Sequence, residues 1–355
     1  MEYQKLLQLL IDKQGSDIHL IPNYYPTIRV GGELQQLTTL EKITPENAEK
    51  IAFEILNNEQ KEILITNKEI DLAVSYNSFR FRTNFYYAKR QICASFRLIP
   101  SIIKTPEQLN LPAITRKAID LKQGLVLVTG PTGEGKSTTL ASIINEINNK
   151  YSRHIITIED PIEYVYPYSK SIISQRELHH DTHSWTMALK SALREDPDVL
   201  LVGEMRDFDT ISLVLTAAET GHLVFSTLHT NSAPESIDRI IDIFPPHQQN
   251  QVRNQLSSVL KMIITQKLLP KVNTVERVPA VEILINNSAT ASVIREGKTY
   301  LLDNILETGE SDGQLLFEKN LLTLYQAGLI TKETAFSFAI RPKEMEKFIK
   351  IKKLF

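Results

Sequence analysis

The segment from Gly130 to Ser137 has a composition suited to holding a phosphate. It reads Gly130-Pro131-Thr132-Gly133-Glu134-Gly135-Lys136-Ser137 and fits the pattern G-x-x-x-x-G-K-[ST]. An apolar strand precedes it and a helix is expected from Thr138 to Ile147, which is the context that the pattern requires. Backbone N–H groups and the start of the helix would bind phosphate, Lys136 would reach the β- and γ-phosphates, and Ser137 would coordinate Mg²⁺. These residues, together with Thr138, predict a site for ATP and Mg²⁺.

Glu134 is the unusual member of this loop. A carboxylate in a loop that holds phosphate adds like-charge repulsion unless its side chain points away. We expect an exposed side chain that faces solvent or a neighbouring subunit. The alternative is a loop with weakened affinity for ATP.

Two segments rich in acidic side chains follow expected strands. Glu159-Asp160-Pro161-Ile162-Glu163 comes after the apolar run 155–158, and Gly203-Glu204-Met205-Arg206-Asp207 comes after the run 199–202. A P-loop ATPase needs an acid that supports the metal and a base that orients the attacking water, and the ends of parallel strands are where such groups lie. Acids after a strand are often only solvated turn residues. Two such sites in the expected order favour catalysis, with Glu204 in the acidic position of a Walker B-like strand end.

Histidines and arginines provide further candidates. His222 and His229 flank the run 223–228 and lie too far apart on an extended strand to share a metal. The arginines of interest are Arg194 and Arg206 near the acidic segments, and Arg80, Arg82 and Arg97 near the N-terminus. Period-two spacing places Arg80 and Arg82 on one face of a strand. Their simplest role is a solvated surface, whereas in a ring-shaped ATPase they could reach a neighbour's phosphates.

The hydrophobic pattern divides the chain into regions. Residues 1–99 alternate helices (4–11 and 45–56) with strands that have one wet face (70–76, 79–85 and 92–98), which predicts a small α+β domain. Three prolines mark residues 100–112 as a linker. From 113 to 288, apolar strands at 125–128, 155–158, 199–202, 223–225 and 280–284 alternate with helices, which predicts an α/β domain with a parallel sheet. Residues 289–355 are expected to be helical.

Composition excludes several classes of protein. The 355 residues have a net charge of −2, so nothing indicates a surface that binds nucleic acid. Cys93 is the one cysteine, which excludes an intramolecular disulfide and a zinc site built on several cysteines. No apolar run approaches the roughly 18 residues that span a bilayer, and the N-terminus lacks the pattern of a signal peptide. We expect a cytoplasmic protein that meets the membrane only through a partner.

Several motifs together resemble the PilT family of type IV pilus retraction ATPases, within the secretion ATPase superfamily. The matching segments span nearly the whole chain: Ser16-Asp17-Ile18-His19-Leu20, the loop at 130–137, residues 156–163, residues 191–198, residues 203–207, and the histidine-containing segments 217–222 and 226–230. The resemblance implies a PAS-like N-terminal domain, a RecA-like ATPase domain and a homohexameric ring. It also implies, as partners, a PilC-like platform protein at the inner membrane base of the pilus machine and a paralogous retraction ATPase.

The resemblance also implies roles for single residues. Glu163 would be the general base, with Glu159 beside it, and Glu204 would support Mg²⁺. His222 and His229 would couple the nucleotide to motion. Arg194 and Arg206 would lie near the phosphates, and Arg80, Arg82 and Arg97 would approach the nucleotide from the N-terminal domain.

Three related functions stay open. An assembly ATPase of a pilus or type II secretion system usually has an extra N-terminal domain and often a four-cysteine zinc module, so the single cysteine favours retraction. A PilU-like accessory ATPase is compatible with Glu134 and with residues 289–296, because only Val293-Ile294-Arg295-Glu296 fits the family's Ala-Ile-Arg-Asn-Leu-Ile-Arg-Glu motif. A DNA translocase would need a strongly basic surface, which the composition does not supply.

Overall fold

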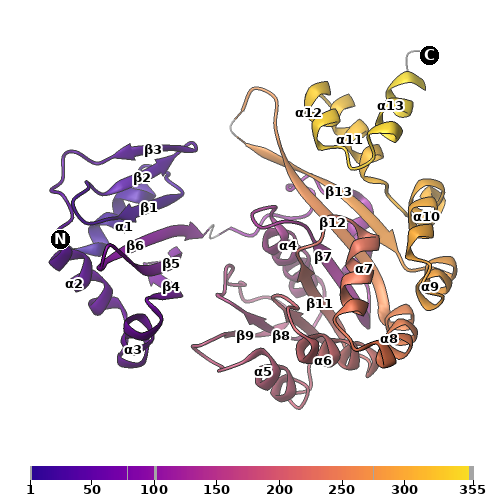
Figure 1. Cartoon of the computed structure of the whole chain (residues 1–355), viewed down its shortest axis with the longest axis horizontal. Coiled ribbons are helices and arrows are strands. Elements are labelled where there is room, and N and C mark those ends of the chain that lie inside the picture. Colours follow the sequence, from indigo (N-terminus) through magenta and orange to yellow (C-terminus); the bar gives the residue numbers. More distant parts are fainter. Residues whose placement is uncertain (1, 78, 100–101, 275, 352–355) are drawn as a thin grey trace. The chain divides into compact units, whose positions relative to one another are not determined.

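A computed structural model describes residues 2–77, 79–99, 102–274 and 276–351 (Figure 1). These form two compact units. The first contains the chain up to residue 102 together with 160–165, and the second contains 103–159 and the chain from 166 onward. The short segment 160–165 therefore leaves the second unit and packs with the first.

The first unit is built on an antiparallel sheet with strand order β3-β2-β1-β6-β5-β4. Its helices are α1 (Tyr3–Asp12), α2 (Pro45–Ile55) and α3 (Asn58–Asn67). Its strands are β1 (Asp17–Leu20), β2 (Thr27–Val30), β3 (Glu33–Gln36), β4 (Glu69–Tyr76), β5 (Phe79–Ala88) and β6 (Gln91–Ile99). The sequence pattern predicted α1, α2 and β4 to β6, whereas α3 was not predicted, because its apolar residues show almost no helical periodicity.

Alternation along β5 explains the two faces of this sheet. Phe81 and Phe85 are fully buried in the core of the first unit, and Phe85 packs edge-on against Phe96 of β6 with ring centroids 5.8 Å apart. Arg80 and Arg82 occupy the intervening positions and emerge on the other face, as the period-two spacing predicted. Helices cover the apolar face of the sheet, and the other face carries charged side chains.

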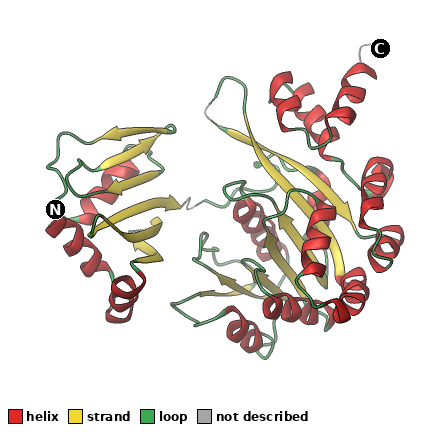
Figure 2. Ribbon diagram, viewed as in Figure 1, coloured by secondary structure: helices red, strands yellow, loops and turns green. Residues whose placement is uncertain are grey.

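The second unit is organised around a seven-stranded sheet of order β13-β12-β7-β11-β10-β8-β9 (Figures 1 and 2). Its parallel strands are β7 (Gly124–Thr129), β8 (His154–Glu159), β9 (Ile172–Glu177), β10 (Val199–Val202), β11 (Leu223–Leu228) and β12 (Leu260–Pro270). β13 (Arg277–Ile285) pairs antiparallel with β12, so the prediction of a wholly parallel sheet is wrong at this edge. The reason is that β12 and β13 are joined by a short hairpin, which permits only antiparallel pairing.

Helices bury both faces of this sheet. Leu125 and Leu127 of β7 face one apolar cluster, with helices α5 to α10, whereas Val126 and Val128 face another, which contains α4. This explains the unbroken apolar run that the sequence shows at β7. The helices are α4 (Lys136–Lys150), α5 (Trp185–Ala192), α6 (Phe208–Glu219), α7 (Ala233–Asp242), α8 (Pro246–Val259), α9 (Ser288–Arg295) and α10 (Leu302–Thr308).

Helices form most of the described residues from 288 to 351, and the last three dock on the β12–β13 hairpin. Residues 352–355, which the prediction of a helical end also covered, lie outside the described residues. The helices α11 (Phe317–Gln326), α12 (Lys332–Phe338) and α13 (Pro342–Ile351) pack around Leu269 and Val278 of the hairpin. Their largest buried side chain is Phe317, with no exposed surface. Helices α11 to α13 thus form an apolar cluster of their own, separate from the two that cover the sheet.

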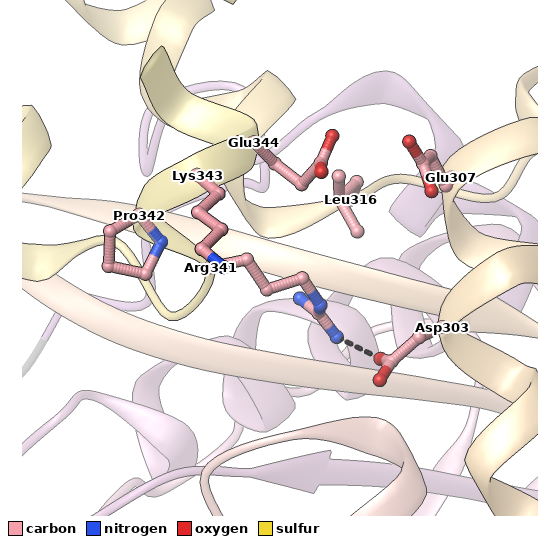
Figure 3. Close-up of a pocket in the computed structure, with 7 residues that line it drawn as sticks. All are labelled: Asp303, Glu307, Leu316, Arg341, Pro342, Lys343 and Glu344. Atoms are coloured by element: carbon pink, nitrogen blue, oxygen red, sulfur yellow. Dashed lines mark hydrogen bonds and ion pairs between the residues drawn. The ribbon is translucent and has the colours of Figure 1, made fainter. Parts of the chain in front are cut away.

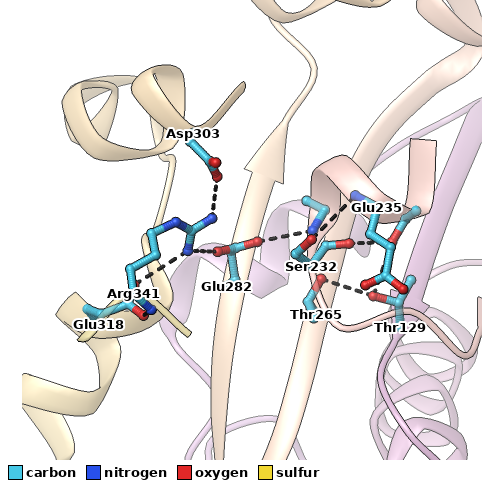
Figure 4. Close-up of polar contacts among 10 residues, drawn as sticks. Thr129, Ser232, Glu235, Thr265, Glu282, Asp303, Glu318 and Arg341 are labelled. Carbon is cyan, nitrogen blue, oxygen red and sulfur yellow. Dashed lines mark hydrogen bonds and ion pairs between the residues drawn. The ribbon is translucent and has the colours of Figure 1, made fainter. Parts of the chain in front are cut away.

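Arg341, which precedes α13, joins this bundle to the sheet through a buried ion-pair cluster (Figure 4). Its guanidinium lies 2.8 Å from the carboxylate of Glu282 on β13 and 3.4 Å from that of Glu318 on α11, and it also pairs with Asp303. Glu282 and Glu318 have no exposed surface. Glu282 also accepts a hydrogen bond from the backbone N–H of Ala233, 3.0 Å away, which is the first residue of α7.

The same arginine lies beside a pocket of about 490 Å³ (Figure 3). Asp303, Glu307 and Glu344 line it together with Arg341, Leu316, Pro342 and Lys343. None of these residues comes from the loop at 130–137 or from the ends of the parallel strands. The pocket therefore belongs to the junction between α10 and α13, and we assign it no ligand.

Loss of Arg341 should destabilise the second unit. Burial raises the pKa of Glu282, although Arg341 opposes this effect. Removing the guanidinium by Arg341→Met leaves buried carboxylates unpaired, which should lower the free energy of unfolding by about 3–5 kcal/mol at pH 7. Denaturant unfolding followed through Trp185, the one tryptophan, reports on this unit.

The pH dependence identifies the cause of that loss. A carboxyl whose folded-state pKa is raised stabilises the fold most below its unfolded pKa, and this contribution is lost as the pH rises through the folded value. The defect of Arg341→Met should therefore shrink as the pH falls toward 5, and adding Glu282→Gln should restore part of the stability at pH 7. Lys298→Met, which removes the exposed partner of Glu296, should change stability by no more than about 0.5 kcal/mol. A pH-independent defect would contradict the role of the buried carboxylate.

Candidate nucleotide-binding site

The loop at 130–137 connects the end of β7 to the start of α4. Its glycines Gly130, Gly133 and Gly135 have φ values of +143°, +83° and +79°, respectively. Lys136 is buried, and its ammonium group donates to the carbonyl oxygens of Gly130 at 2.7 Å and Pro131 at 2.8 Å. The loop therefore wraps around a positive charge at the N-terminus of a helix, an arrangement that attracts phosphate.

Ser137 and Thr138 follow in the first turn of α4, and both are half-buried. Their backbone N–H groups belong to the helix end that lacks intrahelical acceptors. The two hydroxyl groups and these N–H groups provide donors and a metal-binding oxygen directly beside Lys136. The binding of ATP and Mg²⁺ by residues 130–138 stays a prediction.

Glu134 does not face solvent, so the expectation of an exposed side chain is wrong. The residue is half-buried, and its carboxylate accepts a hydrogen bond from the backbone N–H of Leu268 on β12. Its own carbonyl accepts from the side-chain amide of Gln266 at 2.6 Å. The carboxylate is thereby directed to β12.

His229 links the loop to the acidic end of β10. Its Nε2 lies 3.2 Å from the carboxylate of Glu204, and its Nδ1 lies 3.4 Å from the hydroxyl of Thr132 in the loop. A carboxylate only accepts, so Nε2 carries the proton and Nδ1 accepts from Thr132. Burial lowers the pKa of His229, and the charges of Lys136 and Arg206 lower it further. The imidazole is thus a neutral bridge between two strand ends.

Glu204 and Arg206 form an ion pair at the same strand end. The side chain of Glu204 is 17% exposed, and that of Arg206 is 75% exposed, so the arginine can leave the carboxylate at little cost in buried contacts. Asp207 has another task, because its carboxylate accepts from the backbone N–H of Thr210 and caps α6. Glu204 is the acid of this segment that the structure brings to the loop, through His229.

Glu159 lies at the end of β8 and is held by its neighbours. Its carboxylate accepts from the hydroxyl of Thr157 at 2.7 Å and from the amide of Gln175 on β9 at 3.2 Å. These partners orient the carboxylate within the sheet. Gln175 lies on β9, a strand that the sequence reasoning missed.

Glu163 packs in the first unit with two of the predicted arginines. Its carboxylate lies 4.0 Å from the guanidinium of Arg82, which also pairs with Asp71 at 2.5 Å, and Arg80 donates to the carbonyl of Ile162 at 3.0 Å. Segment 160–165 is thus attached to the charged face of β5.

Arg97 lies on the same face, directly opposite Arg82 in the β5–β6 register. Its guanidinium donates to Asp17 of β1 at 2.7 Å. Asp17 is 5% exposed, so its carboxylate is held in the first unit by a charged partner.

His222 and Arg194 are not brought to the loop. His222 precedes β11, whereas the loop and His229 lie at its other end, about 20 Å away along a six-residue strand. Its Nδ1 lies 2.9 Å from the carbonyl oxygen of Ala217, at the end of α6. Arg194 is exposed and follows α5, ahead of β10, whereas Glu204 follows that strand. Within one subunit, both residues therefore lie near the amino ends of the parallel strands, whereas the loop lies at their carboxyl ends.

Gln266 and Thr139 are site residues that the sequence reasoning missed. Gln266 on β12 is 2% exposed and joins the loop to α4, since its amide donates to Glu134 while its carbonyl accepts from the Thr139 hydroxyl at 2.7 Å. A glutamine within the largely apolar segment 260–269 was the available signal, because a buried polar side chain requires partners.

The described residues contain neither a cluster of metal ligands nor a membrane-spanning helix. Across them, no three His, Cys, Asp or Glu side chains gather closely enough to hold a metal ion. Within the same residues, no helix has the length and apolar character needed to cross a bilayer. The fold and the loop are therefore the features that define the class.

Comparisons with known proteins agree with this geometry. The model of the type II/IV secretion system protein family matches residues 4–352. The type IV pilus retraction ATPase PilT of Pseudomonas aeruginosa is 43% identical over 336 residues, covering 94% of this chain and 97% of that protein. The type IV pilus ATPase PilU of the same organism is 36% identical over 352 residues, covering 99% and 92%. A crystal structure of the pilus retraction motor PilT with bound ADP superposes with a TM-score of 0.90 at 44% identity, covering 98% of this chain and 99% of that one.

The fold and the loop define a RecA-like P-loop ATPase that binds nucleotide. The chain belongs to the type II/IV secretion system protein family. Its resemblance to the PilT retraction ATPases, first indicated by the motifs, is confirmed over nearly its whole length.

The bridge formed by His229 has a testable electrostatic signature. Because burial and two nearby cations lower its pKa, the imidazole should titrate below 6.5, the ordinary value for histidine. Nitrogen-detected NMR of histidine-labelled protein should show this midpoint, with His229→Asn identifying the signal. Since the folded pKa is the lower one, the folded state should lose stability from this group as the pH falls below 6.5. A midpoint above 6.5 would mean that Glu204 outweighs the cations and that the imidazole is charged.

Proposed function

We propose that this chain hydrolyses ATP to power the retraction of a type IV pilus. The observation that carries the proposal is the connection of the phosphate loop to the acidic end of β10 through His229, on a fold that superposes with a retraction motor. This connection links a nucleotide-binding element to a second strand end, so that a change at the phosphates could alter the sheet.

The loop residues would bind the triphosphate. Lys136 would exchange the carbonyls of Gly130 and Pro131 for the β- and γ-phosphate oxygens, and backbone N–H groups of residues 133–138 would bind the remaining oxygens. Mg²⁺ fits the donors present, since the Ser137 hydroxyl and the Glu204 carboxylate offer hard oxygens, and Mg²⁺ usually takes few protein ligands besides phosphate and water. When bound, the metal neutralises charge on the phosphates.

Glu163 is our candidate for the general base, with Glu159 or Glu204 as the alternative. Glu159 is engaged by Thr157 and Gln175, and these contacts favour a positioning role for it. The contact of Glu163 with Arg82, at 4.0 Å, is a looser one, which leaves its carboxylate available to accept a proton from water.

A homohexameric ring would complete the site. Arg80, Arg82 and Arg97 would then act from the first unit, and the exposed Arg194 and Arg206 could meet the phosphates of a neighbouring subunit. His222, which lies at the amino end of β11, would act at a subunit boundary. We further propose a cytoplasmic location at the inner-membrane base of the pilus machine, with a PilC-like platform protein and a paralogous retraction ATPase as partners.

An accessory, PilU-like role is the second candidate. The divergent segment 289–292 favours it, together with 36% identity to PilU. Steady-state ATP hydrolysis by the purified chain separates the two, because an accessory subunit would show little turnover without its partner motor.

Lys136→Ala should abolish both hydrolysis and retraction. The variant loses the one side-chain cation within the loop, and removing such a transition-state contact typically costs at least a hundredfold in kcat. The measurements are steady-state phosphate release and pilus retraction in a strain whose own motor gene is deleted and replaced. Lys150→Ala, at the other end of α4, pairs with Asp120 and is the matched control that should keep activity. Retraction by the Lys136→Ala protein would exclude hydrolysis by this chain as the power source.

Glu163→Gln should bind ATP normally yet hydrolyse it roughly 10²–10⁴-fold more slowly, because only the proton acceptor is removed. A fluorescent-nucleotide titration and single-turnover hydrolysis distinguish the two effects. Glu159→Gln, made in parallel, should retain most of its turnover. If the two variants exchange these phenotypes, Glu159 is the base.

A further inference from the structure

β12 continues past the end of its neighbour in the sheet. Its pairing with β7 ends at Thr265 opposite Thr129, whereas its pairing with β13 continues to Pro270 opposite Arg277. Residues 266–270 of β12 therefore pair with β13 on one side, and on the other side the described part of the chain places no strand. Backbone N–H groups on such an edge need acceptors from elsewhere.

The phosphate loop covers this edge. Gly130 passes so close to β12 that a Cβ built on it would lie 2.3 Å from the carbonyl oxygen of Gln266. Gln266 donates to the carbonyl of Glu134, and Arg277 donates to the carbonyl of Gly133 at 3.4 Å. The carboxylate of Glu134 then accepts from the N–H of Leu268. A side-chain oxygen thus takes the place that a strand carbonyl would otherwise occupy.

We propose that Glu134 is a positioning residue that holds the phosphate loop in its nucleotide-binding shape by pairing with the edge of β12. The contact also removes the difficulty of an acidic residue in this loop, because the carboxylate is turned toward a backbone donor. Its hydrogen bond to Leu268 and the two hydrogen bonds of Gln266 connect the loop, α4 and β12 to one another. The proposal rests on nucleotide binding at this loop and is independent of retraction.

Two substitutions separate positioning from simple charge repulsion. Glu134→Ala removes both the charge and the acceptor, whereas Glu134→Gln removes the charge and keeps an amide oxygen that can accept from Leu268. If the carboxylate only repelled phosphate, both variants would bind nucleotide more tightly than the wild type. If Glu134 positions the loop, the alanine variant should bind more weakly and the glutamine variant should not.

We expect the Kd of a fluorescent ADP analogue to rise roughly tenfold in Glu134→Ala, about the effect of losing one charge-assisted hydrogen bond, and to stay at or below the wild-type value in Glu134→Gln. The KM for ATP should rise by a similar factor while kcat changes less, because bound phosphate restores the loop. Glu276→Ala is the matched control, since it removes a different carboxylate, one that belongs to the β12–β13 hairpin and pairs with Lys271. The proposal would be overturned if Glu134→Ala bound the ADP analogue as tightly as the wild type, or if Glu134→Gln bound it as weakly as Glu134→Ala.

Amide exchange tests the contact without nucleotide. Deuterium uptake in a peptide covering residues 266–270 should be faster in Glu134→Ala than in wild type and in Glu276→Ala, with Glu134→Gln close to wild type. Unchanged uptake in Glu134→Ala would overturn the proposal even if all four proteins bind ADP equally. Absence of ADP binding by the wild type would instead contradict the proposed function, and the exchange result would still decide the contact.

Discussion

The unequal length of two neighbouring strands is the constraint on which the ATPase site depends. β7 ends at Thr129 and β12 continues to Pro270, so the chain that leaves β7 can lie along an edge instead of entering solvent. Only glycine can occupy position 130, because any side chain there would collide with Gln266. The loop that holds Lys136 is therefore shaped by its contact with β12 as much as by its own glycines.

A second set of contacts leaves the loop on its other side. Thr132 meets His229, which meets Glu204, so the ends of β7, β11 and β10 are joined by polar side chains. Thr129, the residue directly before the loop, also contacts Thr265 at 2.9 Å (Figure 4). Because hydrogen-bonded networks in a partly dry site are directional, displacement of one member changes the geometry of the next. The loop is in this way the meeting point of three strand ends and one helix.

Patterns that depend on neighbours in sequence were predictable, and contacts between distant segments were not. The period-two alternation predicted a strand at 79–85, which the structure extends to residue 88, and the glycine spacing predicted the loop, because both reflect local geometry. β12 was missed because Leu260 to Leu269 follows α8 without a glycine or proline to separate them. The environment of Glu134 could not be predicted, since its partner lies 134 residues away on that unrecognised strand. The transfer of segment 160–165 to the first unit was also invisible, because no local signal marks it.

Glu282 and Arg341 carry a consequence for the history of the family. The carboxylate contacts both the start of α7 and the arginine ahead of α13. Loss of Arg341 alone strands a carboxylate that has no exposed surface, whereas loss of Glu282 alone leaves the arginine with Glu318 and Asp303. A lineage that lost Arg341 before Glu282 would pass through a poorly folded intermediate, whereas one that replaced Glu282 first would not. Among descendants of a common ancestor, positions 282 and 341 should therefore vary jointly, and the C-terminal helices should be inherited together with the sheet they contact.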